Sequence, residues 1–178
     1  LKEALRELGE DLKKKYSNLN YKFSLDTQPI LERDLAYRAG LGWFGKNSML
    51  ISQKQGSYFI IGALLLDQTL ALTPREVDTD HCGTCTAYID ACPTSAIDKS
   101  SRTLDSNKCI ATYTIELFKD EEPPNGYESG VGEIFGCDIC QDVCPWNGEA
   151  LLANESSLYD VGNNEQKKIM DFYQKRDS

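Results

Sequence analysis

Seven cysteines are the residues of this chain best suited to chemistry, and none of them lies in the first 81 residues. An odd count argues against a closed set of disulfides, and a disulfide framework would spread its bridges over the whole chain. Clustered thiols are typical of a metal domain in a reducing compartment, so we expect a cytoplasmic protein. The cysteines are Cys82, Cys85 and Cys92 in one group, Cys137, Cys140 and Cys144 in another, and Cys109 between them.

The spacing of the cysteines predicts two iron–sulfur clusters. The segment from Cys82 to Pro93, CGTCTAYIDACP, follows the ferredoxin pattern C-x2-C-x2-C-x3-C-P, except that Tyr88 stands at the third cysteine position. In two-cluster domains the cysteine before proline binds the other cluster. We therefore expect a first cluster on three cysteines with Tyr88 at its fourth corner, and a second cluster on four: Cys82, Cys85 and Cys144 for the first, and Cys92, Cys109, Cys137 and Cys140 for the second.

Tyr88 leaves the state of the first cluster open. A phenol binds iron in catalase, but its ordinary pKa is about 10 and it is longer than a thiolate. A three-iron cluster, a labile 4Fe–4S cluster and a cluster with a non-thiolate ligand are the alternatives. His81, the single histidine, is either a further iron ligand or a solvated side chain. A structural zinc site on the two C-x2-C pairs is the competing interpretation, and it leaves both Cys-Pro pairs unexplained.

The elements that must position these cysteines are indicated by hydrophobic periodicity and by turn residues. Leucines spaced along the first 12 residues predict an amphipathic helix, and three glycines between residues 40 and 45 predict an unusual loop that can approach a ligand closely. The expected elements are a helix over 1–16, a strand over 21–25, a helix over 29–39, a hairpin of strands 49–51 and 58–66 joined at Gln55-Gly56, and a helix over 105–117.

Composition narrows the class of protein. The 178 residues are 40% hydrophobic and 26% charged, which are globular proportions. The longest apolar run, Tyr58 to Leu66, is much shorter than the roughly 20 residues of a membrane-spanning helix, and we expect no membrane partner. The net charge of −9 argues against a general nucleic-acid binder, because affinity for phosphate depends on Lys and Arg. A single structured RNA bound through a local basic patch stays open.

Two segments before the cysteines point to one family. Asp26 to Arg33, DTQPILER, and Arg38 to Asn47, RAGLGWFGKN, together with the cysteine motifs and CPWN at Cys144 to Asn147, resemble epoxyqueuosine reductase. The resemblance covers about residues 21–147. This family uses cobalamin and two 4Fe–4S clusters for the last step of queuosine synthesis, at the wobble position of tRNA.

The resemblance implies a fold and a chemistry. The fold class is α+β, with part of an α/β cobalamin-binding domain at 1–75, a ferredoxin-like two-cluster iron–sulfur domain at 76–150 and a polar C-terminal tail at 151–178. Electrons would pass through the clusters to cobalamin, which removes the epoxide oxygen. The resemblance makes Asp26 the proton donor beside the corrin, and a carboxylic acid suits that role. From the residues alone a turn or capping aspartate before Pro29 is the favoured interpretation, and the surrounding motif makes the catalytic role equally favoured.

Further residues match cofactor positions in this family. Leu50 and Ile61 match strand positions that line the corrin, although periodicity alone makes both of them core residues. Asp138 matches a residue near the cofactor and is otherwise a solvated acid. Arg33 and Lys46 are candidate contacts for cofactor or substrate, and a surface role suits each equally.

The family also implies partners, and two other functions compete with it. We expect tRNA carrying epoxyqueuosine, an electron donor and a monomeric protein. The family's N-terminal part of the cobalamin domain and its C-terminal tRNA-binding repeats have no match, so we expect a core region only. The alternatives are a ferredoxin-like electron-transfer module and a reductive dehalogenase-like cobalamin enzyme. An electron carrier needs neither Asp26 nor the glycine-rich loop, so these two features distinguish the readings.

Overall fold

The computed structural model describes residues 1–73, 75–117, 122–130, 133 and 135–148, and the expected polar tail lies outside them. Helices and strands are mixed, which confirms the α+β class at that level. The elements are α1 (Lys2–Lys15), β1 (Tyr21–Ser24), α2 (Glu32–Arg38), β2 (Trp43–Phe44), β3 (Leu50–Ile51), β4 (Ala63–Leu66), α3 (Ala87–Ala91), α4 (Ile110–Thr112), a π-helical turn (Tyr113–Leu117), a 3-10 turn (Tyr127–Gly130), α5 (Ile139–Asp142) and a second 3-10 turn (Pro145–Asn147).

The N-terminal unit is a helix packed on an antiparallel two-stranded ribbon. Strand β1 pairs with β4 in the register Tyr21 to Leu66. Helix α1 lies against this ribbon through buried Leu5 and Gly9. A Cβ at Gly9 would come within 2.3 Å of the Tyr21 ring, so a glycine is needed for the helix and strand to approach this closely. The expected helix and first strand are therefore confirmed, within one residue at most ends.

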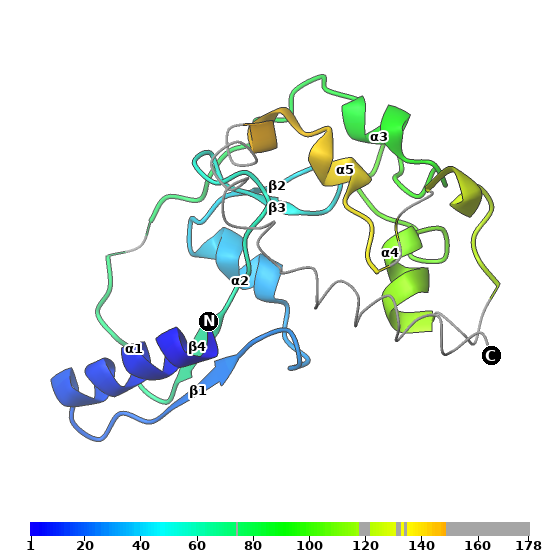
Figure 1. Cartoon of the computed structure of the whole chain (residues 1–178). Helices are drawn as coiled ribbons and strands as arrows, with labels where there is room; N and C mark the ends of the chain where they lie inside the picture. Colours follow the sequence, from blue (N-terminus) through cyan, green and yellow to red (C-terminus); the bar gives the residue numbers. More distant parts are fainter. Residues whose placement is uncertain (74, 118–121, 131–132, 134, 149–178) are drawn as a thin grey trace, which may run out of the picture.

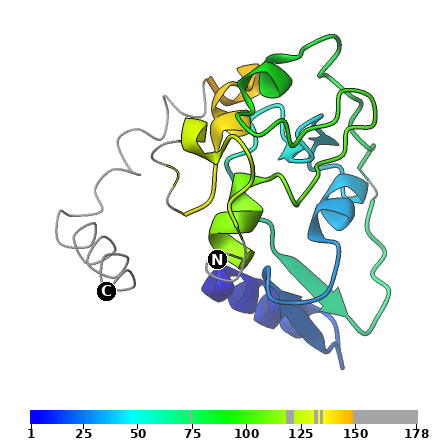
Figure 2. The same cartoon turned by 90° about the vertical axis from the view of Figure 1, so that its right-hand side faces the viewer.

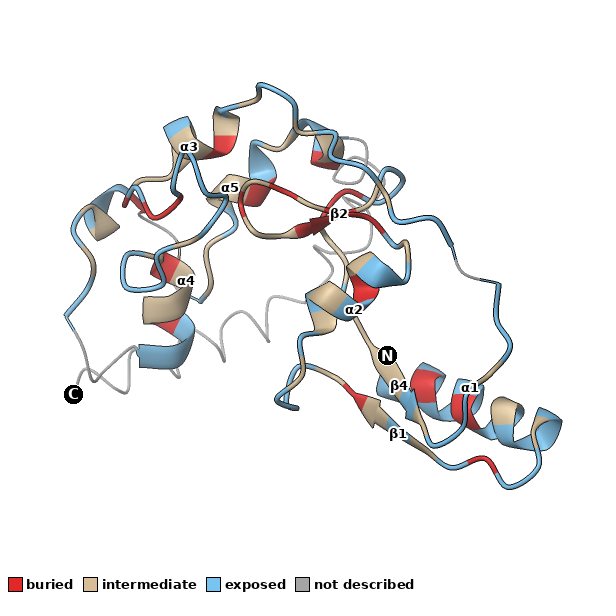
Figure 3. Cartoon of the chain, turned by 180° about the vertical axis from the view of Figure 1, so that it is seen from behind, coloured by how far each residue is buried: buried red, intermediate tan, exposed pale blue. Residues whose placement is uncertain are grey.

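A second ribbon, β2–β3, lies near the centre of the molecule and is largely buried (Figure 3). Trp43 pairs with Ile51 and Phe44 with Leu50. A Cβ at Gly42 would come within 2.1 Å of the Ile51 carbonyl oxygen. The glycine-rich loop therefore contains a strand, because glycine at position 42 lets its backbone reach β3.

The expected hairpin between 49–51 and 58–66 is wrong. Strand β3 pairs with β2, and β4 pairs with β1, so the two predicted strands have different partners. Only a single bridge between Ser52 and Gly56 remains of the predicted turn. The apolar run after Tyr58 becomes a strand only from Ala63. Local alternation gave the wrong partner because long-range packing of α1 and the glycine-rich loop decides the pairing.

Two expected helices are shorter than their patterns. Helix α2 begins at Glu32 rather than at residue 29. Helix α4 begins at Ile110 rather than at residue 105, because Asp105 accepts hydrogen bonds from the backbone of Asn107 and Lys108. This local turn competes with helix formation and places Cys109 immediately before the helix.

The helices and strands form separate groups along the molecule (Figures 1 and 2). The α1–β1–β4 unit lies at one end, helices α3, α4 and α5 lie at the other, and α2 with the β2–β3 ribbon lies between them (Figure 1). Between β4 and α3, the residues that the structure describes form neither helix nor strand. In the part of the chain that the structure describes, no helix has both the length and the apolar character needed to cross a membrane.

Candidate functional site

The seven thiols line two neighbouring cavities at the α3–α4–α5 end of the molecule. The first cavity, of about 250 Å³, is lined by Cys82, Cys85 and Cys144 together with Tyr88. The second, of about 30 Å³, is lined by the other four cysteines: Cys92, Cys109, Cys137 and Cys140. Cys140 also lines the first cavity and so lies between the two. This grouping is the one that the crossed ferredoxin spacing predicts.

The electrostatic interactions among the thiols show the same division into two groups. Burial, and then the nearby thiols of Cys137, Cys109 and Cys92, together raise the pKa of Cys140 to about 12. Burial also raises the pKa of Cys144, but its thiol neighbours are Cys82 and Cys85. Thiols that raise one another's pKa in this way release their protons readily only when a cation binds among them. The donor set of each cavity therefore suits an iron–sulfur cluster.

Tyr88 stands at the corner of the first site where the ferredoxin pattern has a cysteine. It lies on α3, is 7% exposed and lines the same cavity as the three thiols. Burial, and then the neighbouring Cys82 and Cys85, raise the pKa of its phenol. The Lys46 ammonium lies 6.0 Å from the centre of the Tyr88 ring and donates to the Cys85 carbonyl at 3.0 Å.

The second site is enclosed by its own segment of the chain. Every residue that lines it comes from position 92 or later, and Ile97, Ile110 and Ile139 form much of the wall. The Cys92 sulfur accepts a hydrogen bond from the backbone N–H of Ala96 at 3.3 Å. Four thiols with an apolar wall form a complete donor set for one cluster.

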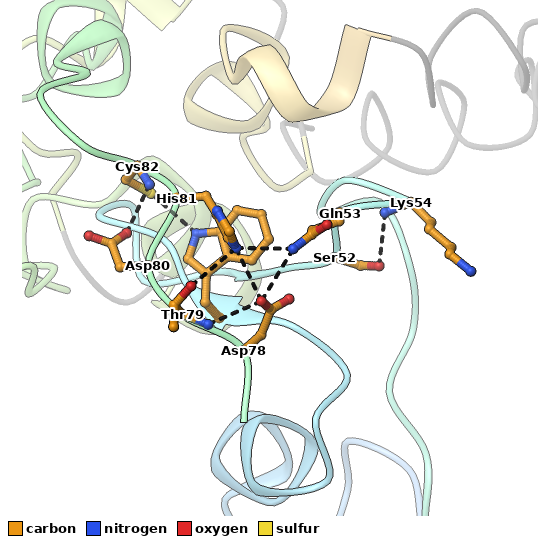
Figure 4. Close-up of polar contacts among 9 residues, drawn as sticks. Ser52, Gln53, Lys54, Asp78, Thr79, Asp80, His81 and Cys82 are labelled. Carbon is orange, nitrogen blue, oxygen red and sulfur yellow. Dashed lines mark hydrogen bonds and ion pairs between the residues drawn. The ribbon is translucent and has the colours of Figure 1, made fainter. Parts of the chain in front are cut away.

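Aromatic side chains from distant parts of the chain cover the first site. Trp43 packs edge-on against His81 and Trp146, with ring centres 4.7 and 5.0 Å apart. The Trp43 indole N–H donates to the Cys82 sulfur at 3.4 Å. His81 lines the cavity, but its Nε2 contacts Asp78 at 3.1 Å and Gln53 at 3.0 Å (Figure 4). The histidine nitrogen that was a candidate iron ligand is thus engaged with Asp78 and Gln53.

A buried polar network attaches the cysteine segment to the first half of the chain. Asn147 has no exposed surface, and its amide oxygen accepts a hydrogen bond from the Ser57 N–H at 2.6 Å. The Asn147 amide donates to the Ser57 hydroxyl and to the Gln141 carbonyl, and the Ser57 hydroxyl donates to the Gln141 side chain. A Cβ at Gly56 would come within 1.9 Å of the Asn147 amide oxygen. The sequence offered only one signal for this network, the asparagine in CPWN.

The competing zinc site receives no geometric support. A structural zinc ion needs four ligands at about 2.0–2.3 Å from one point. Cys82 and Cys85 line the first cavity and Cys137 lines the second, with Cys140 between the two, so the two C-x2-C pairs do not enclose one common site.

The residues that the resemblance assigns to cobalamin are not gathered in one cavity. Leu50 is buried in β3, whereas Ile61 lines a separate hollow of about 870 Å³ beside α1. Asp138 is exposed and accepts a hydrogen bond from the Gln141 side chain. Asp26 is exposed on the loop between β1 and α2. The described residues therefore do not by themselves form a corrin site.

Asp26 has an unusual backbone. Its φ of 57° lies in the left-handed region, which Asp and Asn occupy more readily than most residues. Its carboxylate makes no hydrogen bond or ion pair with any residue that the structure describes. The capping interpretation is therefore not supported, since α2 begins at Glu32 without a side-chain cap.

Arg33, a candidate contact, lines a third cavity, of about 420 Å³, between α2 and the glycine-rich loop. Its guanidinium donates to the Ser48 carbonyl. Arg102 lies in the same wall and forms an ion pair with Asp80 at 2.6 Å. Lys46, the other candidate, lines the first cluster site instead. The structure thus separates these two candidates.

Comparison with known proteins confirms the resemblance. The 4Fe-4S double cluster binding domain family matches residues 81–147. The epoxyqueuosine reductase of Leadbetterella byssophila is 45% identical over 159 residues, which are 89% of this chain and 51% of that protein. The chain therefore spans about half the length of the curated relatives it matches.

Solved structures give the same result. A Bacillus subtilis epoxyqueuosine reductase, described with its aspartate catalytic loop swung out of the active site, is 31% identical with a TM-score of 0.71, over 83% of this chain and 37% of that one. A structure of epoxyqueuosine reductase with an epoxyqueuosine-modified tRNA stem loop is 33% identical with a TM-score of 0.69, over 82% of this chain and 38% of that one.

Proposed function

We propose that this chain forms the core of an epoxyqueuosine reductase, an oxidoreductase that converts epoxyqueuosine in tRNA to queuosine. The observation that supports it most is the division of seven thiols between two adjacent cavities, in a chain 45% identical to such a reductase. Two adjacent clusters carry electrons one at a time, and the reaction needs two. Opening the epoxide breaks two C–O bonds, forms a C=C bond and releases the oxygen as water, which requires two electrons and two protons.

The cofactors of this function are two iron–sulfur clusters and cobalamin. When bound, they supply the electron-carrying and reducing chemistry. Cys82, Cys85 and Cys144 would hold the first cluster, and the remaining four cysteines the second. Leu50, Ile61 and Asp138 stay proposed contacts for cobalamin on the basis of the resemblance. These three residues do not share a cavity, so they do not outline a corrin site by themselves.

Two successive parts of the chain would have different roles. Residues 1–75 would be part of the cobalamin-binding domain and residues 76–150 the iron–sulfur domain. An electron donor would supply the two electrons of the reaction. The substrate would be tRNA carrying epoxyqueuosine, as in the related structure with a modified stem loop. We also propose a cytoplasmic monomer, because the thiols need a reducing compartment.

Asp26 would supply a proton to the departing epoxide oxygen. A carboxylic acid held near a reacting oxygen can act as a general acid. The exposed, left-handed position of Asp26 on the loop between β1 and α2 leaves its carboxyl without a partner among the described residues. The related Bacillus subtilis structure has an aspartate catalytic loop that swings out of its active site. A loop of that kind would carry its acid in the same exposed way.

A reconstitution assay tests this function. Anaerobic protein with both clusters restored would be mixed with cobalamin, a low-potential reductant and tRNA containing epoxyqueuosine. Nucleosides released from the tRNA would then be measured by mass spectrometry. Conversion to queuosine that requires both cobalamin and reductant is the expected result. A protein that is reduced and passes electrons to an acceptor while epoxyqueuosine stays unchanged would favour the electron-transfer reading.

A further inference from the structure

We propose that Trp43 sets the reduction potential of the first cluster through its N–H···S hydrogen bond to Cys82. The inference rests on the cluster assignment in the proposed function and goes beyond it. It makes the glycine-rich loop, which contributes no ligand, a part of the redox centre. Trp43 is then a positioning residue that acts through a ligand.

The donor and its partner are well defined. The distance from Trp43 Nε1 to Cys82 Sγ is 3.4 Å, and the Trp43 side chain is only 1% exposed. An indole nitrogen can donate a hydrogen bond but cannot accept one. Among the described residues the Cys82 sulfur is the one partner of this N–H. Because a buried donor without a partner is costly, the hydrogen bond is expected to persist.

The surrounding residues fix the direction of the N–H. His81 and Trp146 both pack edge-on against the Trp43 ring, and their own ring centres lie 5.7 Å apart. His81 is itself held by Asp78 and Gln53 (Figure 4). Below the ring, Trp43 is part of the β2–β3 ribbon. The indole is therefore oriented before any cluster binds.

A hydrogen bond to a thiolate ligand has a predictable electrical effect. Reduction adds negative charge to a cluster and its sulfurs, so a donor at a sulfur stabilises the reduced form more than the oxidised form. Hydrogen bonds to the sulfurs are among the factors that set cluster potentials. Removing the Trp43 N–H should therefore make the potential of the first cluster more negative.

The effect should be confined to the first site. At the second site, the Cys92 sulfur contacts the backbone N–H of Ala96 and the Thr94 hydroxyl, at 3.3 and 3.7 Å. Neither contact involves Trp43. The second cluster thus serves as an internal reference in the same molecule.

The test is a redox titration of anaerobic, cluster-loaded protein followed by EPR. Trp43→Phe removes the N–H and keeps an aromatic ring. Trp146→Phe is the matched control, because it makes the same change in a tryptophan that lines the first cavity and contacts Trp43 but has no hydrogen bond to Cys82. The signal lost in Cys144→Ser identifies the first cluster. We expect Trp43→Phe to lower the ratio of reduced to oxidised first cluster about tenfold at a given potential, a shift of about 59 mV for one electron. Trp146→Phe should shift it much less.

A second measurement keeps the full-size side chain. In the Trp146→Phe background, replacing the remaining Trp43 with 5-fluorotryptophan makes the indole N–H a stronger donor. The first-cluster potential should then move in the positive direction, opposite to Trp43→Phe. This variant avoids any cavity that a smaller ring would leave.

The outcomes separate this inference from the proposed function, since neither tRNA nor cobalamin is present. Equal shifts in both phenylalanine variants, or fluorination without a shift, would overturn the role of Trp43 and leave the reductase proposal intact. A protein that shows the expected shift at the first cluster but fails the reconstitution assay would overturn the reductase proposal and leave the role of Trp43 intact. A protein that takes up iron without sulfide would overturn both.

Discussion

The first cluster site is completed by side chains from the glycine-rich loop, whereas the second is built from its own segment. Lys46, Asn47 and Ile51 line the first cavity, and Trp43 donates to one of its sulfurs. The second cavity contains only residues from position 92 onward. The first is also larger, about 250 Å³ against about 30 Å³, and it has the Tyr88 phenol beside Cys82, Cys85 and Cys144, whereas Cys140 lies between the two cavities.

This difference indicates a division between an adjustable and a fixed site. A cluster held by four thiols in a cavity lined from one segment depends mainly on that segment, and its contact with the glycine-rich loop is the Asn47 amide, which donates to the Cys140 carbonyl at 3.2 Å. A cluster whose surroundings come from two parts of the chain responds to how those parts pack together. We therefore expect changes at the loop to alter the first cluster and spare the second.

The largest expected effect lies outside both sites. Asp26→Asn keeps the size, the polarity and the left-handed backbone but removes the acid. If Asp26 delivers the proton, turnover of epoxyqueuosine should fall about 100- to 10,000-fold in protein whose wild-type form is active. Cluster content and corrin spectra should stay unchanged. Wild-type turnover would exclude the catalytic role, and loss of the corrin spectrum would make Asp26 a cofactor contact.

The next effect tests the crossed ligand sets directly. Cys137→Ser and Cys144→Ser alter two cysteines of the same motif, yet these line different cavities. Each variant should lose about half of the bound iron, because each removes a ligand of one of two clusters. Mössbauer spectra should show that the second cluster is lost in the first variant and the first cluster in the second. Loss of the same component in both variants would contradict the division into two sites.

Tyr88 gives a smaller effect that is confined to the first site. Tyr88→Cys should restore a fourth thiolate and add about one iron atom, converting a three-iron cluster to 4Fe–4S and removing its EPR signal. Tyr88→Phe is the matched variant, because it keeps the ring and removes only the oxygen. Unchanged iron in Tyr88→Phe would show that the phenol is not a ligand. Iron content and EPR that Tyr88→Cys leaves unchanged would contradict an incomplete first cluster.

The sequence predicted the grouping of the cysteines better than the pairing of the strands. The crossed ligand sets follow from spacing, because the order of cysteines around two adjacent clusters is a local property of each motif. Strand pairing was not predictable in the same way. The strand at Ala63 finds its partner at Ser24, 39 residues earlier, and alternation does not specify which strand lies opposite.

The contacts between the two halves of the chain were also missed. Trp43 and Asn147 were noticed as parts of family motifs, but their contacts with Cys82 and Ser57 join residues 39 and 90 positions apart. Periodicity carries no information about such distances. The glycine at position 56 read as a simple turn residue, whereas the structure shows that it makes room for Asn147.

The smallest expected effect on the clusters is that of Gly56→Ala, because this substitution removes no ligand. It tests whether the hydrogen-bond network around Asn147 supports the first site. Gly56 has a φ of +64°, and a Cβ there would overlap the Asn147 amide oxygen. Gly56→Ala should therefore lower the free energy of unfolding by about 2–4 kcal/mol, from backbone strain together with the overlap. Gly136→Ala is the control, because its φ is +81° but its Cβ would meet only Ile115 at 3.8 Å.

The control should cost about 1–2 kcal/mol, from backbone strain alone. Anaerobic urea unfolding followed by circular dichroism measures both values. Because Asn147 follows Cys144 by three residues, the displaced network should also speed the loss of the first cluster in air while the second stays intact. Equal unfolding free energies in the two variants, or equal rates of loss from the two clusters, would show that the first site does not depend on this junction between the halves of the chain.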